Sequence, residues 1–193
     1  MRVVTILGSP KSNGNTAHAL DMLETNLALQ GHEVERIHAA ARKINGCTGC
    51  NACIHDKEGP DCVQEDDAMS CFETMISADV LVYAFPLYAF SFPAQMKSLI
   101  DRHYCLVTNA GLPNQSSVLE GKRVALLVTC SDPVENNADI IQTAFDRIFL
   151  DRLRCSIVGK YVVASSAAPD FDQRASEMAK IIAGEIAGSH ALS

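Results

Sequence analysis

Four closely spaced cysteines are the residues of this chain best suited to bind a metal. Cys47, Cys50 and Cys53 are three residues apart, and Cys62 follows after eight intervening residues. Three thiolates on one small loop suit a cubane iron–sulfur cluster, because each of its four irons takes one sulfur. Zinc sites more often use two separate pairs of ligands, and the thiols could also be structural or free. A cluster, zinc and no metal all remain open at this point.

A polar segment at residues 8–16, Gly-Ser-Pro-Lys-Ser-Asn-Gly-Asn-Thr, could bind an anion. It precedes a helical pattern, and the free N–H groups and dipole of a helix start favour negative charge. The same residue types are common helix caps, so a simple capped helix also fits. The segment lacks the signatures of a P-loop and of a dinucleotide site. The candidate phosphate contacts are Ser9, Lys11, Ser12, Asn13, Asn15 and Thr16.

The hydrophobic pattern of the rest of the chain predicts the elements that position these segments. Strands are expected at 3–7, 33–38, 79–85, 122–129 and 156–164. Helices are expected from about Asn15 to Gly31, from Asp66 or Asp67, and at 94–102, 137–151 and 170–187. This alternation implies a parallel sheet covered on both faces. The second strand is polar and therefore suits a sheet edge, which fits the strand order 2-1-3-4-5.

Ligands in such sheets bind beyond the carboxyl ends of the strands, where the strand order reverses. The loops 8–16, 86–92 and 130–136 are therefore expected to meet at one edge of the sheet. The segment 44–66, which holds the four cysteines, shows no periodicity and is expected to be an insertion loop. We expect a single domain over residues 1–193, because the sequence contains no linker and no repeat.

The overall composition excludes several classes of protein. The net charge is -7 and the isoelectric point is near 5.3. Both argue against binding to nucleic acid or to an anionic membrane surface, which need clustered Lys and Arg. No stretch approaches the length of a transmembrane helix, and the N-terminal apolar run is too short for a signal peptide. We therefore expect a cytoplasmic protein, in which disulfides are unfavourable.

Three stretches together resemble the group of NADPH-dependent FMN reductases and iron–sulfur flavoproteins, whose fold is a flavodoxin-like three-layer sandwich. The resemblance covers about residues 1–105. It rests on Gly8 to Thr16, on Cys47 to Asp67, and on Ala78 to Arg102. The last stretch includes Phe85-Pro86-Leu87-Tyr88, Ser91, Pro93, Lys97 and Ile100-Asp101-Arg102.

The resemblance implies that residues 8–16 hold the phosphate of flavin mononucleotide (FMN). It also implies that the loop 86–92 lies against the isoalloxazine ring, through Pro86, Leu87, Tyr88 and Phe90. Topology alone places the loop 130–136 on the ring's other side, with Thr129, Cys130 and Ser131 as candidates. In the iron–sulfur flavoproteins a compact cysteine motif ligates a 4Fe–4S cluster. The spacer before Cys62 is longer here, but Gly59 and Pro60 allow the chain to bring Cys62 back.

The activity implied by the resemblance is that of an FMN-dependent oxidoreductase. NADPH or NADH passes hydride to the flavin, which then reduces a quinone, another flavin or another small-molecule or protein acceptor. No side chain is expected to act as nucleophile or obligatory base, because the flavin carries the chemistry. The alternative is an iron–sulfur flavoprotein that relays electrons without a dedicated small-molecule substrate. A homodimer or homotetramer is expected, as is common in the group.

Other reactive residue types are expected to be structural. Cys71, Cys105 and Cys155 fall in or beside predicted elements and suit small buried positions. Asp66 and Asp67 are expected to cap a helix rather than to bind a divalent metal. His103 is expected at the surface, and Asp101-Arg102 in an ion pair or a subunit contact. Phe92 fits either the core or a dimer interface.

Overall fold

The computed structural model describes residues 1–54 and 61–188. Its main sheet has five parallel strands in the order β2-β1-β3-β6-β7. They are β1 (Arg2–Leu7), β2 (Glu33–His38), β3 (Val80–Pro86), β6 (Arg123–Thr129) and β7 (Ser156–Val163). The expected order 2-1-3-4-5 is therefore confirmed. The inner strands are mostly apolar and almost completely buried because both of their faces are covered, whereas the edge strand β2 is partly exposed.

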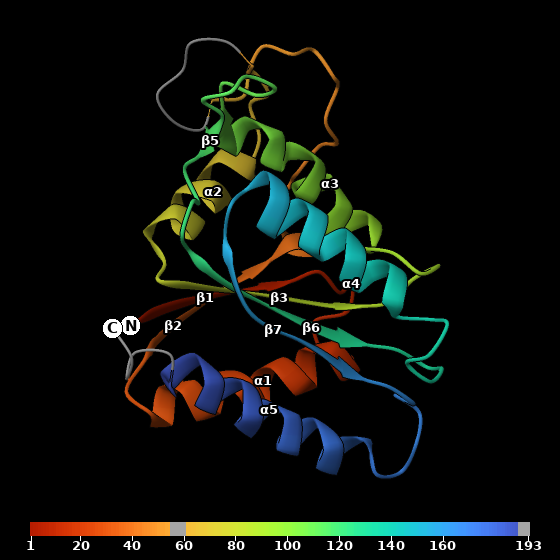
Figure 1. The fold of residues 1–193 in the computed structure, drawn as a ribbon. Coiled ribbons are helices and arrows are strands. Elements are labelled where there is room, and N and C mark those ends of the chain that lie inside the picture. The colour runs from red at the N-terminus through yellow and green to blue at the C-terminus, as the bar shows by residue number, and fades with distance from the viewer. Residues whose placement is uncertain (55–60, 189–193) are drawn as a thin grey trace.

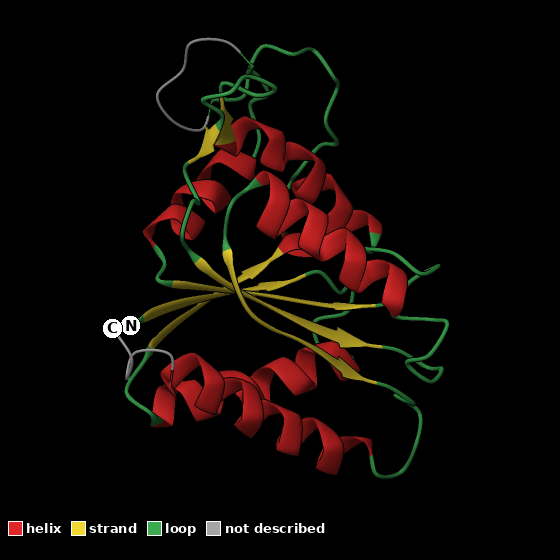
Figure 2. Ribbon diagram, viewed as in Figure 1, coloured by secondary structure: helices red, strands yellow, loops and turns green. Residues whose placement is uncertain are grey.

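Helices cover both faces of the sheet and make three layers (Figures 1 and 2). On one face lie α1 (Asn15–Leu29) and α5 (Phe171–Gly188), which pack with the sheet around one apolar cluster. On the other face lie α2 (Ala68–Ser77), α3 (Ala94–Arg102) and α4 (Asp139–Phe145), around a second cluster. None of the helices in the described parts of the chain combines the length and apolarity that a membrane crossing requires.

Several short elements were not expected from the sequence. The helix expected at 137–151 is instead α4 followed by a π-helical segment, η3 (Asp146–Arg152). Two short 3₁₀ turns, η1 (Ala39–Ala41) and η2 (His103–Leu106), follow β2 and α3. The strands β4 (Val107–Thr108) and β5 (Ser116–Ser117) form a separate antiparallel pair. Elements this short carry no detectable hydrophobic period, and for that reason the sequence does not reveal them.

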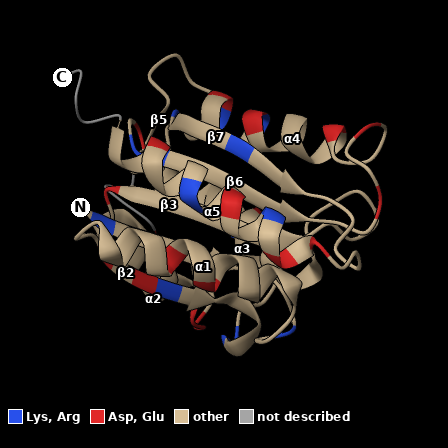
Figure 3. Ribbon diagram, turned by 90° about the horizontal axis from the view of Figure 1, so that it is seen from below, with Lys and Arg blue, Asp and Glu red and all other residues tan. Residues whose placement is uncertain are grey.

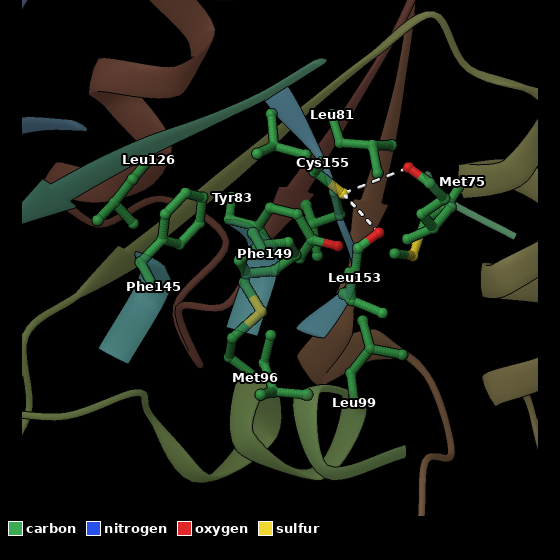
Figure 4. Packing of buried hydrophobic residues seen from close by; sticks show 14 of the residues in the cluster. Met75, Leu81, Tyr83, Met96, Leu99, Leu126, Phe145, Phe149, Leu153 and Cys155 are labelled. Atoms are coloured by element: carbon green, nitrogen blue, oxygen red, sulfur yellow. Dashed lines mark hydrogen bonds between the residues drawn. The ribbon is translucent and has the colours of Figure 1, made fainter. Parts of the chain in front are cut away.

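The expectation that His103 lies at the surface is wrong. The residue is 1% exposed, because the turn η2 directs it from the end of α3 into the core. Its Nε2 lies 3.0 Å from the Tyr83 hydroxyl, and its Nδ1 lies 2.8 Å from the Leu99 carbonyl oxygen. Around them pack Phe145 and Phe149, whose ring centroids are 4.3 Å apart (Figure 4).

The structure also places the other residues that were expected to be structural. Cys71, Cys105 and Cys155 are buried. Phe92 is buried within its own chain, with its ring centroid 4.9 Å from that of Phe85. Asp66 accepts a hydrogen bond from the backbone N–H of Ala68 at the start of α2 and also pairs with Arg102. Asp67 occupies the N-cap position, but its side chain makes no capping hydrogen bond. Arg102 therefore forms an ion pair inside its own chain.

Candidate functional site

A cavity of about 300 Å³ opens at the carboxyl edge of the sheet, where the strand order reverses. The loops after β1, β3 and β6 all contribute to its wall, as the topology predicts. All the predicted flavin contacts except Ser12, Asn13 and Phe90 line it. The lining residues among them are Ser9, Lys11, Asn15, Thr16, Pro86, Leu87, Tyr88, Thr129, Cys130 and Ser131. Ser12, Asn13 and Phe90 are exposed outside this lining.

The loop from Gly8 to Thr16 leaves the start of α1 open toward the cavity. Gly14 stands at the N-cap position in an extended conformation, and no side chain caps the helix. The first N–H groups of α1 therefore lack the side-chain acceptor that a simple capped helix would have. Lys11 and Ser9 line the cavity beside this helix start. The arrangement suits an anionic group such as a phosphate ester.

Hydrogen bonds to distant elements hold the same loop in place. The Thr16 and Thr129 hydroxyls are 2.6 Å apart and join the start of α1 to the end of β6. The Asn15 side-chain amide donates to the Ser166 carbonyl oxygen at 2.6 Å. His38, the last residue of β2, places its Nε2 2.9 Å from the Ser9 carbonyl oxygen. The loop is thus fixed from three strand ends before any ligand arrives.

The loop after β3 forms a tight turn at the mouth of the cavity. Tyr88 and Ser91 exchange two backbone hydrogen bonds, of 3.2 and 2.9 Å. Between them, Ala89 and Phe90 have positive φ angles of 47° and 61°. Residues other than glycine adopt such a backbone conformation at a cost in free energy. Tyr88 is 47% exposed and faces the cavity, while Phe90 is 53% exposed and lies beyond it. Pro86 and Leu87 complete an apolar wall.

The loops after β6 and β7 close the remaining side of the cavity. The Cys130 thiol donates to the Asp132 carbonyl oxygen at 3.2 Å. Burial, together with the Asp132 carboxylate, raises the pKa of Cys130, so the group is a neutral thiol at pH 7. Ser166 also lines the cavity and donates its backbone N–H to the Cys130 carbonyl oxygen at 2.9 Å. Ser166 is not among the residues predicted from the sequence, although its position just after β7, at the same edge, could have revealed it.

The cysteine segment rises over α2 and α3 after β2 ends (Figure 1). Cys47 and Cys50 are exposed, whereas Cys53 and Cys62 are half-buried and pack against the core. Burial raises the pKa of the Cys53 thiol most, and the nearby thiols of the other three cysteines raise it further. Backbone and Thr48 hydrogen bonds lower the pKa of the exposed Cys50. Gly59 and Pro60 lie outside the described residues.

Four contacts close the base of this segment. Lys43 and Asp67 exchange two hydrogen bonds, from the Lys43 N–H to Asp67 Oδ2 at 2.7 Å and from the Asp67 N–H to the Lys43 carbonyl at 2.9 Å. The Asn45 N–H donates to Asp66 Oδ2 at 2.9 Å, and the Gln64 amide donates to the Gly46 carbonyl at 3.1 Å. Cys47 follows Gly46, and Cys62 precedes Gln64 by two residues. The first and last cysteines are therefore next to the contacts that close the base.

Within the described residues, no three His, Cys, Asp or Glu side chains converge on a point where a single metal ion could bind. Tetrahedral zinc requires such convergence, because all four ligands contact one ion. A cubane cluster instead presents four separate irons, so its sulfur ligands surround a larger body. Four thiols that leave a closed base are a donor set of the kind a cubane cluster takes.

A family model described as NADPH-dependent FMN reductase matches residues 1–170. Over 102 residues, 53% of the chain, the sequence is 41% identical to an iron–sulfur flavoprotein of Archaeoglobus fulgidus, of which 45% is covered. Over 122 residues, 63% of the chain, it is 34% identical to an iron–sulfur flavoprotein of Methanocaldococcus jannaschii, of which 58% is covered. The chain thus spans about half the length of these two relatives.

The fold is also found in solved structures. The NAD(P)H:quinone oxidoreductase from Methanothermobacter marburgensis superposes with a TM-score of 0.74 over 95% of this chain and 97% of that chain, at 16% identity. This likeness confirms the expected flavodoxin-like fold. The chain belongs to the NADPH-dependent FMN reductase family of NAD(P)H-dependent oxidoreductases.

Proposed function

We propose that this protein is an FMN-dependent oxidoreductase that takes hydride from NADPH or NADH and reduces a quinone, a flavin or another acceptor. The observation that carries the proposal is the cavity at the switch point of the sheet, bounded by an uncapped helix start at one end and an apolar wall at the other. The helix start suits the phosphate ester of FMN, and the apolar wall suits its flat ring system. The cavity volume is at the lower end of the range for small-molecule sites.

The donors of the phosphate loop suit the anionic end of FMN. We assign the phosphate to the free N–H groups at the start of α1, with Ser9, Asn15 and Thr16 around it. Ser12 and Asn13 lie outside the cavity lining and stay predicted contacts of the same loop. Lys11 adds a positive charge that partly neutralises the phosphate. The Thr16–Thr129 hydrogen bond of 2.6 Å keeps this donor set aligned with the end of β6, so the chain does not have to reorganise when the anion binds.

The ring end of the site positions the flavin and excludes water from one side. Bound FMN supplies the hydride and electron chemistry. Pro86, Leu87 and Tyr88 provide an apolar and aromatic surface for the ring, and the exposed Phe90 stands where a second planar molecule could approach. Thr129, Cys130 and Ser131 offer polar atoms at the opposite wall. The neutral Cys130 thiol is there as a packing group and weak donor, since it is not a thiolate.

Anaerobic rapid mixing of the FMN-loaded protein with NADPH and, separately, with NADH tests this function. We expect at least one nicotinamide to bleach the flavin absorbance near 450 nm within seconds, and the bleached protein to be reoxidised by a soluble quinone. If neither nicotinamide reduces the flavin while a reduced electron carrier does, the hydride-transfer function is refuted. Failure to bind FMN at micromolar concentration would refute the flavin site itself.

A second proposal concerns the four cysteines, which we assign as ligands of a 4Fe–4S cluster. The closed base of the segment and the mutual proximity of the thiols support it. With such a cluster the protein could also act as an electron carrier between the flavin and another redox centre. The two curated relatives named above carry the description iron–sulfur flavoprotein.

The visible spectrum of protein isolated anaerobically, together with iron and acid-labile sulfide assays, tests the cluster. We expect a broad absorbance shoulder under the flavin bands and about four irons per chain. A Cys53→Ser variant should lose most of this iron. The matched control is Cys71→Ser, which changes a buried cysteine outside the segment and should retain it. Equal iron in both variants would contradict the assignment.

A homodimer or homotetramer remains part of the proposal. The exposed aromatic residues Tyr88 and Phe90 stand beside the cavity, where a second subunit could cover the ring. Sedimentation of the FMN-loaded protein measures the assembly directly. A monomer at micromolar concentration would contradict it.

A further inference from the structure

The guanidinium of Arg102 is buried beneath the base of the cysteine segment. The residue is 2% exposed and lies at the end of α3. Its Nη1 donates to Asp66 Oδ2 at 2.8 Å and to the Asn45 carbonyl oxygen at 3.2 Å. Nη1 therefore links the two chain segments of the base, one at Asn45 and the other at Asp66.

The rest of the guanidinium has no partner of this kind. Nε and Nη2 are buried, and no nitrogen or oxygen atom in the described parts of the chain accepts a hydrogen bond from them. Buried polar groups are nearly always hydrogen-bonded, and leaving a charged donor unpaired is costly. A structural ion pair needs only the two contacts that Nη1 already makes. The free donors therefore indicate an acceptor beyond Asp66 and Asn45.

The cysteine thiols are the groups next to these donors. The Cys62 thiol raises the pKa of Arg102 through its charge and through a side-chain hydrogen bond, and Cys50 also interacts with the guanidinium through charge. Cys53 and Cys62 are half-buried against the core on which Arg102 also rests. The only other charge that bonds to Arg102 in the described structure, the carboxylate of Asp66, is engaged through Nη1. Sulfur is thus the acceptor type that this environment offers to Nε and Nη2.

We infer that Arg102 is the positioning residue of the cluster site, with Nε and Nη2 donating hydrogen bonds to sulfur atoms of the cluster held by Cys47, Cys50, Cys53 and Cys62. This inference rests on the cluster assignment of the proposed function. Hydrogen bonds and positive charge beside a cluster stabilise its more negative, reduced form. Arg102 therefore does two things. It fixes the base from which the first and last ligands leave, and it raises the reduction potential of the cluster.

The test is a potentiometric titration of the anaerobically reconstituted, FMN-loaded protein, followed by the electron paramagnetic resonance signal of the reduced cluster. Arg102→Gln removes the charge and should lower the midpoint potential. We expect at least a tenfold change in the ratio of oxidised to reduced cluster at a fixed potential, which is about 59 mV for one electron. Arg102→Lys keeps the charge but not the planar donor set, and should fall between Arg102→Gln and the wild type.

Asp66→Asn separates this role from a merely structural one. It weakens the same ion pair, but it leaves the guanidinium in place with less negative charge beside it, so the midpoint potential should rise. A merely structural Arg102 predicts the same direction for Asp66→Asn and Arg102→Gln, because both weaken the contact between these two residues. Asp101→Asn, which removes an exposed carboxylate one residue away, is the control and should leave the potential unchanged.

Each outcome decides the question. Opposite shifts in Arg102→Gln and Asp66→Asn support the inference, and shifts in the same direction or no shifts overturn it. If Arg102→Gln loses its fold, judged by circular dichroism and FMN content, the rise expected in Asp66→Asn decides alone. A wild-type protein that is reduced by NAD(P)H but retains no cluster overturns the inference and leaves the flavin function standing. A wild-type protein that holds a cluster but no FMN refutes the flavin function alone.

Discussion

His103 is held in the core as a neutral side chain. The Leu99 carbonyl oxygen can only accept, so Nδ1 carries the proton, and Nε2 is left to accept the hydrogen bond from the Tyr83 hydroxyl. Burial raises the pKa of Tyr83 well above its ordinary value, which keeps that hydroxyl protonated as the donor. Burial also lowers the pKa of His103 from 6.5 to about 4. Protonation of His103 therefore opposes folding.

We predict that His103 makes the free energy of unfolding fall as the pH falls from about 6.5 to about 4. The unfolded chain binds the proton in this range and the folded chain does not, so the contribution is complete above pH 6.5 and lost below pH 4. The difference between 6.5 and about 4 corresponds to roughly 3 kcal/mol.

Urea denaturation at pH 7 and pH 5 measures this effect. A His103→Gln variant should be less stable at pH 7 but should lose less stability than the wild type on going to pH 5. The exposed His18, beside Asp172 on the surface, supplies the control variant His18→Gln, which should keep the wild-type dependence. Parallel pH profiles for the wild type and His103→Gln would contradict the prediction.

At the scale of elements, the site depends on how closely the end of β1 approaches α3. Gly8 donates its N–H to the Ala84 carbonyl at 2.8 Å and starts the loop from Gly8 to Thr16, the proposed phosphate site. A Cβ at this position would lie 2.7 Å from both Cβ and Cε of Met96, and 3.1 Å from Cβ of Phe85. The Cβ atoms of Phe85 in β3 and Met96 in α3 can move only if their backbones move. An added methyl group at position 8 would therefore displace the loop that starts there. A glycine at position 8 is thus required by close packing.

Gly8→Ala should therefore destabilise the protein by about 1–3 kcal/mol, the usual cost of overpacking. Because the strain falls on the phosphate loop, FMN affinity should also drop, by about tenfold for each 1.4 kcal/mol that reaches the site. Thermal unfolding and calorimetric titration with FMN measure the two effects.

Gly184→Ala is the matched control for Gly8→Ala. This glycine is exposed within α5, and its added Cβ would meet no atom within 4 Å. The helix should gain about 0.5–1 kcal/mol, with FMN affinity unchanged. A Gly8→Ala protein with wild-type stability and affinity would contradict the packing argument.

At the scale of the whole molecule, the cavity joins parts of the chain that the two helical layers hold apart. Thr16 comes from α1 on one side of the sheet, and Tyr88 comes from the loop that leads to α3 on the other. On the face seen in Figure 3, acidic and basic residues alternate along α5, whereas α1 carries acidic residues and no Lys or Arg, so these two helices form no basic band. This matches the acidic composition and leaves the sheet edge as the conspicuous binding feature.

FMN should therefore stabilise the whole fold. At a concentration one hundred times its dissociation constant, a ligand that binds only the folded state adds about 2.7 kcal/mol, and the melting temperature should rise accordingly. Thr16→Val removes a hydroxyl beside the proposed phosphate and breaks the bond to Thr129. Since a hydrogen bond to a charged group is worth about 1.5–3 kcal/mol, the affinity should fall by about tenfold or more.

Thr25→Val makes the same change elsewhere on α1. The Thr25 hydroxyl donates only to the Asp21 carbonyl at the exposed side of the helix. FMN should raise the melting temperature of Thr25→Val as much as that of the wild type. Equal FMN affinity in the Thr16 and Thr25 variants would mean that the phosphate does not bind at the start of α1.

The sequence by itself determined the fold and the place where a site should be sought. Strands such as β3 and β6 are continuous apolar runs, and α3 begins at the residue after Pro93, so local patterns define these elements. The polar character of β2 identified the sheet edge, and with it the strand order and the switch point. A phosphate-binding role for the loop from Gly8 to Thr16 is predicted by its own residues and by the family resemblance.

Only the tertiary structure decided which side chains meet. Asn15 bonds to Ser166 across 151 positions, and Arg102 pairs with Asp66 across 36. His103 was misplaced because its burial depends on a short turn after α3, and Ser166 was missed because it follows a strand next to the switch point. Periodicity reports which face of an element is apolar. It carries no information on which distant donor and acceptor come together, because that pairing is set by the packing of elements far apart in the chain.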